Sequence, residues 1–155
     1  MQNKLESFYI IRFNDCDPFG HLNNASYINY LLNAREDHLK EFYNVDLRTF
    51  AAKGFGWVVS SHEIQYIRSA NYNDRVCIQS TLLELGESHL LVEMLMYDET
   101  GESLKAIMWT KFTCINLKTG KKDNHIEEFM EFAKTMLVPN VDGKAGLKAR
   151  IEELK

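Results

Sequence analysis

The sequence is poor in the features that mark secreted, membrane-spanning and nucleic-acid-binding proteins. Its three cysteines, Cys16, Cys77 and Cys114, are far apart and form no Cys-x-x-Cys pair, so neither a disulfide framework nor a zinc ribbon is expected. No apolar run is long enough for a signal-peptide core or a membrane span. The 18 basic residues face 22 acidic ones and form no basic block, which disfavours nucleic acid as a partner. We therefore expect a cytoplasmic protein with neither membrane nor nucleic acid as a partner.

The 155 residues fit one domain. Runs rich in aromatic and β-branched residues predict five strands, at 5–13, 57–68, 76–85, 89–97 and 103–117. Short turn-like segments such as 86–88 and 98–101 separate the later runs, and connections of this length require antiparallel neighbours. We expect the last four strands to form a meander.

One long apolar helix is expected between the first and second strands. Tyr27, Leu31, Ala34 and His38 recur at helical spacing and share one face, and the helix should end near Asn44. The side chains of its entrance, from residues 23, 24 and 26, are of types that cap helix N-termini. A second, shorter amphipathic helix is predicted at about 126–137.

These elements predict an α+β fold with a five-stranded antiparallel sheet. One long helix cannot cover both faces of such a sheet, and runs such as 103–115 carry large apolar residues on both faces. We therefore expect a homodimer, or a dimer of dimers, in which a second subunit buries part of the sheet or its edge. The charged tail at 141–155 is expected to be either a further exposed helix or a mobile segment.

The segment NDCDPFGHLNNASY, residues 14–27, is unusually polar for a helix entrance. As a calcium loop it lacks oxygen ligands at two needed positions, including the final bidentate carboxylate. As an Asp-x-Asp phosphatase motif it would need a parallel sheet with several crossover helices, which the chain does not supply. With one histidine, His21, it is a poor transition-metal site, and no metal is expected.

Turn formation alone accounts for part of this segment, because Asp, Asn, Gly and Ser shape turns and helix entrances without any chemistry. We assign Asp15, Gly20 and Ser26 to that structural task. Seven such residues exceed what capping requires, however, and the helix that follows is apolar enough to be buried. Free N–H groups at the N-terminus of a buried helix form a site for an anion or an oxyanion.

Three stretches carry a resemblance to a known family. FNDCDPFG at 13–20 resembles the corresponding motif of the hotdog-fold acyl-CoA thioesterases that are similar to 4-hydroxybenzoyl-CoA thioesterase. HLNNASY at 21–27 looks like the His-x-Asn-Asn-x-x-Tyr variant of many bacterial acyl-CoA and acyl-ACP thioesterases, and ANYND at 70–74 resembles the family's turn before its next strand. The order of predicted elements agrees from about residue 5 to 120.

The resemblance implies a hotdog fold over residues 1–140, in which the sheet wraps around the long helix and active sites lie at a dimer interface. It implies that the chain hydrolyses acyl-CoA thioesters to the free acid and CoA. Asp17 would be the nucleophile or the general base, and the backbone amide near Asn24 would polarise the thioester carbonyl. His21 would either orient these groups or stabilise the turn.

Three further residues are candidates for substrate binding, and each also has a structural role as an alternative. Asn23 would orient Asp17 or water, Tyr27 would line the acyl pocket or fill the core, and Glu63 would reach the site from the partner subunit. No cofactor is expected beyond the CoA of the substrate.

The thiol carrier and the reaction each have more than one candidate. Where the family carries basic residues that meet the nucleotide phosphates, this chain has Gly86-Glu87-Ser88-His89, so an acyl-carrier protein could replace CoA. A hotdog enoyl-CoA hydratase or dehydratase would act on the acyl chain and not on the thioester bond. A noncatalytic dimer that binds acyl thioesters would use the helix entrance without needing Asp17.

Overall fold

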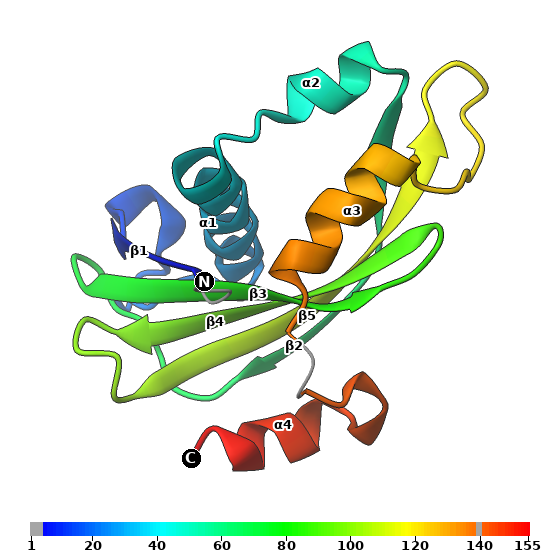
Figure 1. Ribbon diagram of the computed structural model, residues 1–155. Helices are drawn as coiled ribbons and strands as arrows, with labels where there is room; N and C mark the ends of the chain where they lie inside the picture. The colour runs from blue at the N-terminus through cyan, green and yellow to red at the C-terminus, as the bar shows by residue number, and fades with distance from the viewer. Residues whose placement is uncertain (1–4, 139–140) are drawn as a thin grey trace.

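The computed structural model describes residues 5–138 and 141–155, which form one antiparallel sheet and four α-helices (Figure 1). The strands are β1 (Leu5–Ile10), β2 (Phe55–Tyr66), β3 (Arg75–Leu85), β4 (His89–Asp98) and β5 (Leu104–Asn116). The helices are α1 (Asn24–Tyr43), α2 (Leu47–Ala52), α3 (Glu127–Met136) and α4 (Leu147–Glu153). The predicted α+β architecture, with five antiparallel strands and one long helix, is confirmed. The expected boundary between the domain and the C-terminal tail, after residue 140, involves residues 139–140, which lie outside the described residues.

The strand order in the sheet is β1-β3-β4-β5-β2, and every neighbouring pair is antiparallel. The hairpins at 86–88 and 99–103 join β3 to β4 and β4 to β5, as the turn-like segments predicted. The expected four-stranded meander is wrong, however, because β2 pairs with β5 and forms one edge of the sheet. The connection at 67–74 instead runs past the loop before α1, and it bonds there to that loop's backbone.

Helix α1 begins and ends as its sequence pattern predicted. Tyr27, Leu31, Ala34 and His38 are all buried and lie along one face of the helix. Asn44 adopts a left-handed conformation (φ 54°) and its N–H bonds back to the carbonyls of the last turn, which closes the helix. Helix α1 packs chiefly on β1, β3 and β4. Helix α2 packs against β2, and helix α3 packs chiefly against β3.

Helix α2 has no counterpart among the predicted elements, because residues 47–52 form less than two turns and their composition is that of a polar connection. Asp46 caps this helix by accepting the N–H of Arg48 at 2.9 Å. Phe50 projects from α2 into the aromatic cluster around Phe55 and Trp57, with ring centroids 5.3 Å from each. The short helix therefore closes one end of the space between α1 and the sheet.

The outer face of the sheet is partly covered by the C-terminal segment of the same chain. Leu147 of α4 is buried against a second apolar cluster that includes Ile107 and Trp109, so the tail is helical but not exposed as a whole. The buried Glu93 carboxylate accepts from Arg150 at 2.7 and 2.9 Å and from the Trp109 indole at 3.0 Å. The C-terminal segment of the chain therefore covers part of a face that the sequence analysis left to a second subunit.

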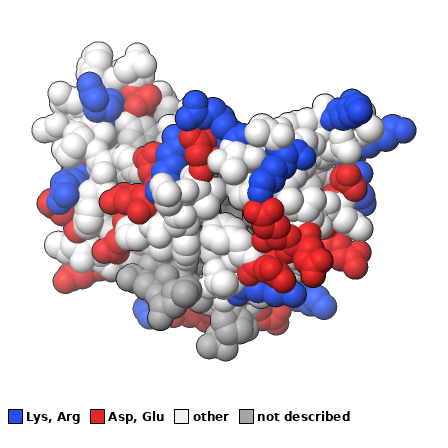
Figure 2. All heavy atoms as spheres, turned by 45° about the horizontal axis from the view of Figure 1, so that its top comes forward, with Lys and Arg blue, Asp and Glu red and all other residues white. Residues whose placement is uncertain are grey.

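Charge is mixed over the surface that carries the helices. Basic and acidic side chains are interspersed on the face shown in Figure 2, with uncharged areas between them. Within the described ranges, 5–138 and 141–155, no helix is both long and apolar enough to cross a bilayer.

Candidate active site

The loop between β1 and α1 holds Asp17 in a tight turn. The backbone N–H of Asp17 donates to the His21 carbonyl at 2.8 Å, and that of Gly20 donates to the Asp17 carbonyl at 2.9 Å. Gly20 has φ +79°, a conformation that residues other than glycine rarely adopt. The Asp17 carboxylate oxygen Oδ1 accepts the N–H groups of Phe19 at 2.9 Å and His21 at 3.0 Å. One carboxylate oxygen thus builds the turn.

The other oxygen of the same carboxylate, Oδ2, is left open. Across residues 5–138 and 141–155, Asp17 Oδ2 makes no hydrogen bond, and Asp17 lines a cleft of about 450 Å³. The two bonds to Oδ1 fix the orientation of the carboxylate, and Oδ2 stays free to accept a hydrogen bond or to react. It can act on a group that enters the cleft.

The N-terminus of α1 opens onto the same cleft. Asn23 is the N-cap, but its side chain makes no capping bond; its carbonyl accepts the N–H of Ser26 at 2.9 Å instead. The expectation that side chains at this entrance cap the helix is therefore wrong for Asn23. The N–H of Ser26, which the Asn23 side chain could have bonded, already donates to the Asn23 carbonyl. In the part of the chain that is described, the N–H groups of Asn24 and Ala25 have no partner. These free donors lie at the positive end of a 20-residue helix.

Asp15 has the structural task that the sequence suggested. Its carboxylate accepts the Tyr30 hydroxyl at 2.6 Å, and its carbonyl accepts the N–H of Asn23 at 2.9 Å. The Tyr30 hydroxyl in turn accepts the N–H of Arg12 at 3.0 Å. Burial and the bond to Asp15 raise the pKa of Tyr30 to about 12. Asp15 therefore ties the loop to α1 and holds the helix entrance in place.

Five of the six predicted site residues line this one cleft: Asp17, His21, Asn23, Asn24 and Tyr27. The His21 side chain is exposed. Tyr27 is buried, and its hydroxyl accepts the N–H of Ala70 at 2.9 Å, so it both supports the cleft wall and fills the core. Burial raises its pKa.

Glu63 lies elsewhere. It pairs with Trp109 of β5, which belongs to the outer cluster, whereas its neighbour His62 pairs with Thr110 on the inner face. In its own subunit Glu63 is therefore exposed on the sheet face opposite α1, away from the cleft.

The end of β2 and the connection after it form a wall of the cleft that the sequence did not reveal. Tyr66 donates its hydroxyl to the Asn24 carbonyl at 2.9 Å and packs edge-on against Tyr27, with ring centroids 5.1 Å apart. Ile67, Arg68 and Ser69 continue the wall. Arg68 adds a cation to the lining of the cleft. Nothing local marked these residues, because they reach α1 only through the position of β2 in the sheet.

The chemistry of the cleft follows from these parts. Asp17, with its unbonded carboxylate oxygen, and Asn24, with its free helix-terminal N–H, line the same cleft, which suits attack on a carbonyl whose oxygen gathers negative charge. Within the described segments, no group of three or more His, Cys, Asp or Glu side chains is placed to hold a metal ion.

The chain matches known proteins both through a family model and through its sequence. The model of the thioesterase-like superfamily matches residues 11–141. The chain is 34% identical over 106 residues to the long-chain acyl-CoA thioesterase FadM of Escherichia coli K12, covering 68% of this chain and 78% of that protein.

Solved structures give the same result for the fold. The probable thioesterase YbaW of Escherichia coli superposes with a TM-score of 0.75 at 28% identity, covering 85% of this chain and 98% of that one. The DHNA-CoA thioesterase of Staphylococcus aureus superposes with a TM-score of 0.76 at 18% identity, covering 85% and 90%. The fold is therefore the hotdog fold, as the motif resemblance implied. By the extent of the family match and the identity to FadM, the chain belongs to the thioesterase-like superfamily.

Proposed function

We propose that this protein hydrolyses acyl-CoA thioesters to the free carboxylic acid and CoA. The observation that supports the proposal is the cleft itself, whose lining includes both Asp17, with an open carboxylate oxygen, and Asn24, with a free N–H at the start of α1. The relationship to an enzyme named long-chain acyl-CoA thioesterase supports CoA as the thiol carrier. The chemistry uses no metal or organic cofactor.

In the proposed reaction the thioester carbonyl oxygen points at the backbone amide of Asn24. Negative charge develops on that oxygen when the carbonyl carbon is attacked, and the helix N-terminus stabilises it. Asp17 has two chemically complete routes. As a nucleophile it forms a mixed anhydride and expels CoA thiolate, and water then hydrolyses the anhydride; as a general base it takes a proton from the water that attacks directly.

Isotope labelling can identify the nucleophilic route. In a single turnover in ¹⁸O-labelled water with enzyme in excess, the released acid carries the label both when water attacks the thioester directly and when it attacks the acyl carbon of an anhydride. Attack of water on the Asp17 side of an anhydride places the label in the Asp17 carboxylate instead, where mass spectrometry of the peptide detects it.

His21 and Asn23 have supporting roles in this proposal. The exposed imidazole of His21 lies at the cleft and its backbone N–H fixes Asp17 Oδ1 at 3.0 Å. We assign it to orienting the carboxylate and the attacking water, with Asn23 beside it. Tyr27 forms the floor on which the thioester lies.

A second copy of the chain completes the proposed enzyme. Strand β2 is 12 residues long, pairs on one side only, and exposes Val58 and Val59, which makes it the edge at which two sheets can join. Glu63 would then act across that junction. Light scattering should give a mass of two subunits, or four for a dimer of dimers; a monomer would contradict this part of the proposal. We also propose a cytoplasmic location.

A panel assay of free-thiol release tests the function directly. Acyl-CoAs of several chain lengths and matching acyl-carrier proteins are offered, together with crotonyl-CoA. Thiol release from acyl-CoAs supports the proposal, and release from carrier proteins alone indicates an acyl-ACP thioesterase. Loss of the crotonyl double bond without thiol release indicates a hydratase, and binding without any turnover indicates a noncatalytic binder.

A further inference from the structure

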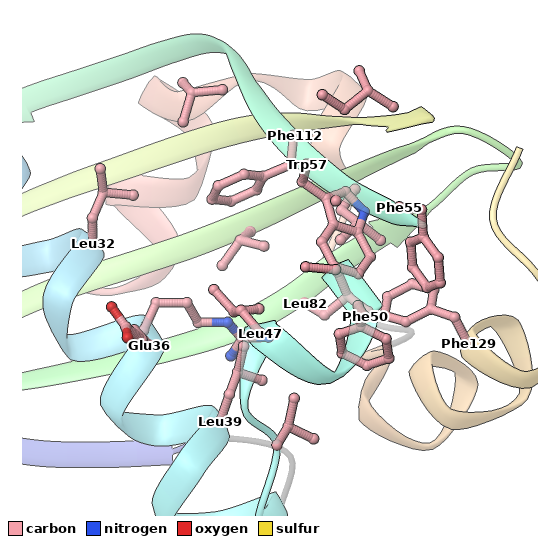
Figure 3. Close-up of a pocket in the computed structure, with 18 of the residues that line it drawn as sticks. Leu32, Glu36, Leu39, Leu47, Phe50, Phe55, Trp57, Leu82, Phe112 and Phe129 are labelled. Carbon is pink, nitrogen blue, oxygen red and sulfur yellow. The ribbon is translucent and has the colours of Figure 1, made fainter. Parts of the chain in front are cut away.

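A second cavity, of about 490 Å³, lies between α1 and the sheet, beside α2 and α3 (Figure 3). It shares no lining residue with the cleft that contains Asp17. The lining is apolar or aromatic apart from Asn33, Arg35 and Glu36. Of these three, Arg35 is a buried cation, which is unusual in apolar surroundings.

The guanidinium of Arg35 lacks a counter-ion. Arg35 is 7% exposed, and within residues 5–138 and 141–155 no Asp or Glu forms an ion pair with it. One hydrogen bond holds it, from Nη1 to Ser80 Oγ at 2.9 Å, which leaves most of its N–H donors unused. Burial lowers the pKa of Arg35 to about 10, so the group is still charged at neutral pH. A buried charge without a partner destabilises the fold.

The neighbours of Arg35 do not supply the missing charge. Glu36 also lines the cavity, but it is about half exposed and pairs with Lys40 at 3.3 Å. Ser80 does not depend on Arg35 for a partner, because its Oγ also bonds His38 Nδ1 at 2.6 Å. The fold therefore buries the Arg35 cation without using its charge.

A second polar group near Arg35 is also without a partner. Tyr43 lies about two turns further along α1 and contributes to the electrostatic environment of Arg35. Its hydroxyl is buried and makes no hydrogen bond in the part of the chain that the structure describes. Its ring packs edge-on against Phe132, with centroids 5.6 Å apart, and Phe132 lines the cavity. The cavity thus lies beside an unpaired cation and an unpaired hydroxyl.

We propose that this cavity binds a free carboxylic acid with an apolar body, and that the carboxylate of this ligand pairs with Arg35. A guanidinium matches the geometry of a carboxylate, and the pair would provide the counter-ion that the fold lacks. The apolar body would pack against Phe50, Trp57 and Phe129, whose side chains gather at one end of the cavity (Figure 3). The uncharged acyl group of a thioester would leave Arg35 unpaired, so the ligand is the acid and not the thioester.

Octanoate and octan-1-ol are matched probes for this site, because they share an apolar body and differ in the charge of the head. Calorimetry near neutral pH measures both affinities. Octanoate should bind the unaltered protein at least tenfold more tightly than octan-1-ol does. Equal affinities, or no binding of octanoate, would overturn the proposal.

Substitution of Arg35 tests whether its charge causes that preference. Arg35→Met should weaken octanoate binding at least tenfold and leave octan-1-ol within twofold. Arg35→Gln, which keeps a donor for Ser80 and loses only the charge, should do the same. Lys40→Met removes a cation from the same helix outside the cavity lining and should change neither affinity. Equal losses for both probes in the Arg35 variants, or the same loss in Lys40→Met, would contradict the assignment.

Urea unfolding separates this role from a purely structural one. Because Ser80 keeps its bond to His38, Arg35→Met removes an unpaired buried cation without leaving Ser80 unbonded. Without ligand, its unfolding midpoint should equal or exceed that of the unaltered protein. Octanoate should raise the midpoint of the unaltered protein alone. A lower midpoint for Arg35→Met with unchanged octanoate affinity would show that Arg35 is structural, against the proposal.

Two adjacent alanines of α2 test where the acid binds. Ala51 and Ala52 are both exposed, but only Ala51 lines the cavity. Ala51→Trp should fill the space and weaken octanoate binding at least tenfold, whereas Ala52→Trp should leave it unchanged. Unchanged binding in Ala51→Trp would place the acid elsewhere and refute the cavity site. These measurements use no thioester, so they stand whether or not the proposed hydrolysis does.

Discussion

The Tyr66 hydroxyl donates to the Asn24 carbonyl at 2.9 Å, which joins the end of the edge strand to the first residue of α1. This bond fixes the width of the cleft between β2 and the helix entrance. It also connects two segments that the sequence alone did not bring together.

Tyr66→Phe should therefore loosen the helix entrance without disturbing the core. Loss of a single exposed hydrogen bond should lower the free energy of unfolding by no more than about 1.5 kcal/mol. We expect kcat/KM for acyl-CoA to fall about tenfold, because a small displacement of the oxyanion donors weakens their effect. Steady-state kinetics and urea unfolding measure the two quantities.

Tyr72→Phe is the control for that change. Tyr72 is also exposed, and its ring packs edge-on against Phe13, outside the cleft lining. Both quantities should stay at the values of the unaltered protein. Equal kinetic losses in the two variants would show that the Tyr66 bond has no special role.

Arg150→Met should destabilise the protein strongly. Glu93 is 1% exposed. Among the residues that the structure describes, removal of the guanidinium leaves its buried carboxylate with only the Trp109 indole as a donor. Breaking a buried ion pair in this way costs about 3–5 kcal/mol. Urea unfolding measures the loss.

Arg75→Met is the matched control, because Arg75 pairs with Glu99 on the surface, 3.0 Å away. Exposed pairs contribute about 0–1 kcal/mol. If Arg150→Met costs no more than Arg75→Met, α4 does not anchor on the outer face as described.

Stability should fall with acidification through His38. This imidazole is 0% exposed, with its ring nitrogens 2.6 and 2.8 Å from the hydroxyls of Ser80 and Ser7. Burial, and then the nearby Arg35, lower its pKa from 6.5 to about 4. The unfolded chain therefore takes up a proton at a higher pH than the folded protein does. The contribution of His38 to stability is complete above pH 6.5 and is lost as the pH falls towards 4.

The lowered pKa of His38 sets the size of this effect. The free energy of unfolding should fall by about 3 kcal/mol between pH 7 and pH 4. His38→Gln should lose that much less stability over the same range. Urea unfolding at several pH values makes the comparison. Parallel curves for the unaltered protein and His38→Gln would refute the assignment.

Local patterns predicted the parts of the fold that depend on local interactions. The apolar face from Tyr27 to His38 indicated α1, and the polar segment before it indicated the turn that holds Asp17. The hairpins β3-β4 and β4-β5 followed from their short turns. These features depend on residues close together in the chain, where periodicity and turn chemistry decide the structure.

The sequence did not predict how segments far apart in the chain lie against one another. Strand β2 pairs with β5 and not with β3, because the connection at 67–74 docks on the loop before α1. That docking brings Tyr66 and Arg68 to the cleft and turns Glu63 towards the outer face. Leu147 and Ile151 of α4 have helical spacing, but the charges around them concealed that they cover the sheet.

The most direct measurement of the central claim is the turnover of Asp17→Asn beside Asp15→Asn. An asparagine at 17 still has an oxygen to accept the N–H groups of Phe19 and His21, so the turn should persist. We predict that kcat for acyl-CoA falls about 10²–10⁴-fold with an unchanged unfolding midpoint, while Asp15→Asn keeps most of the activity. Asp17→Asn turnover close to that of the unaltered protein would contradict the account.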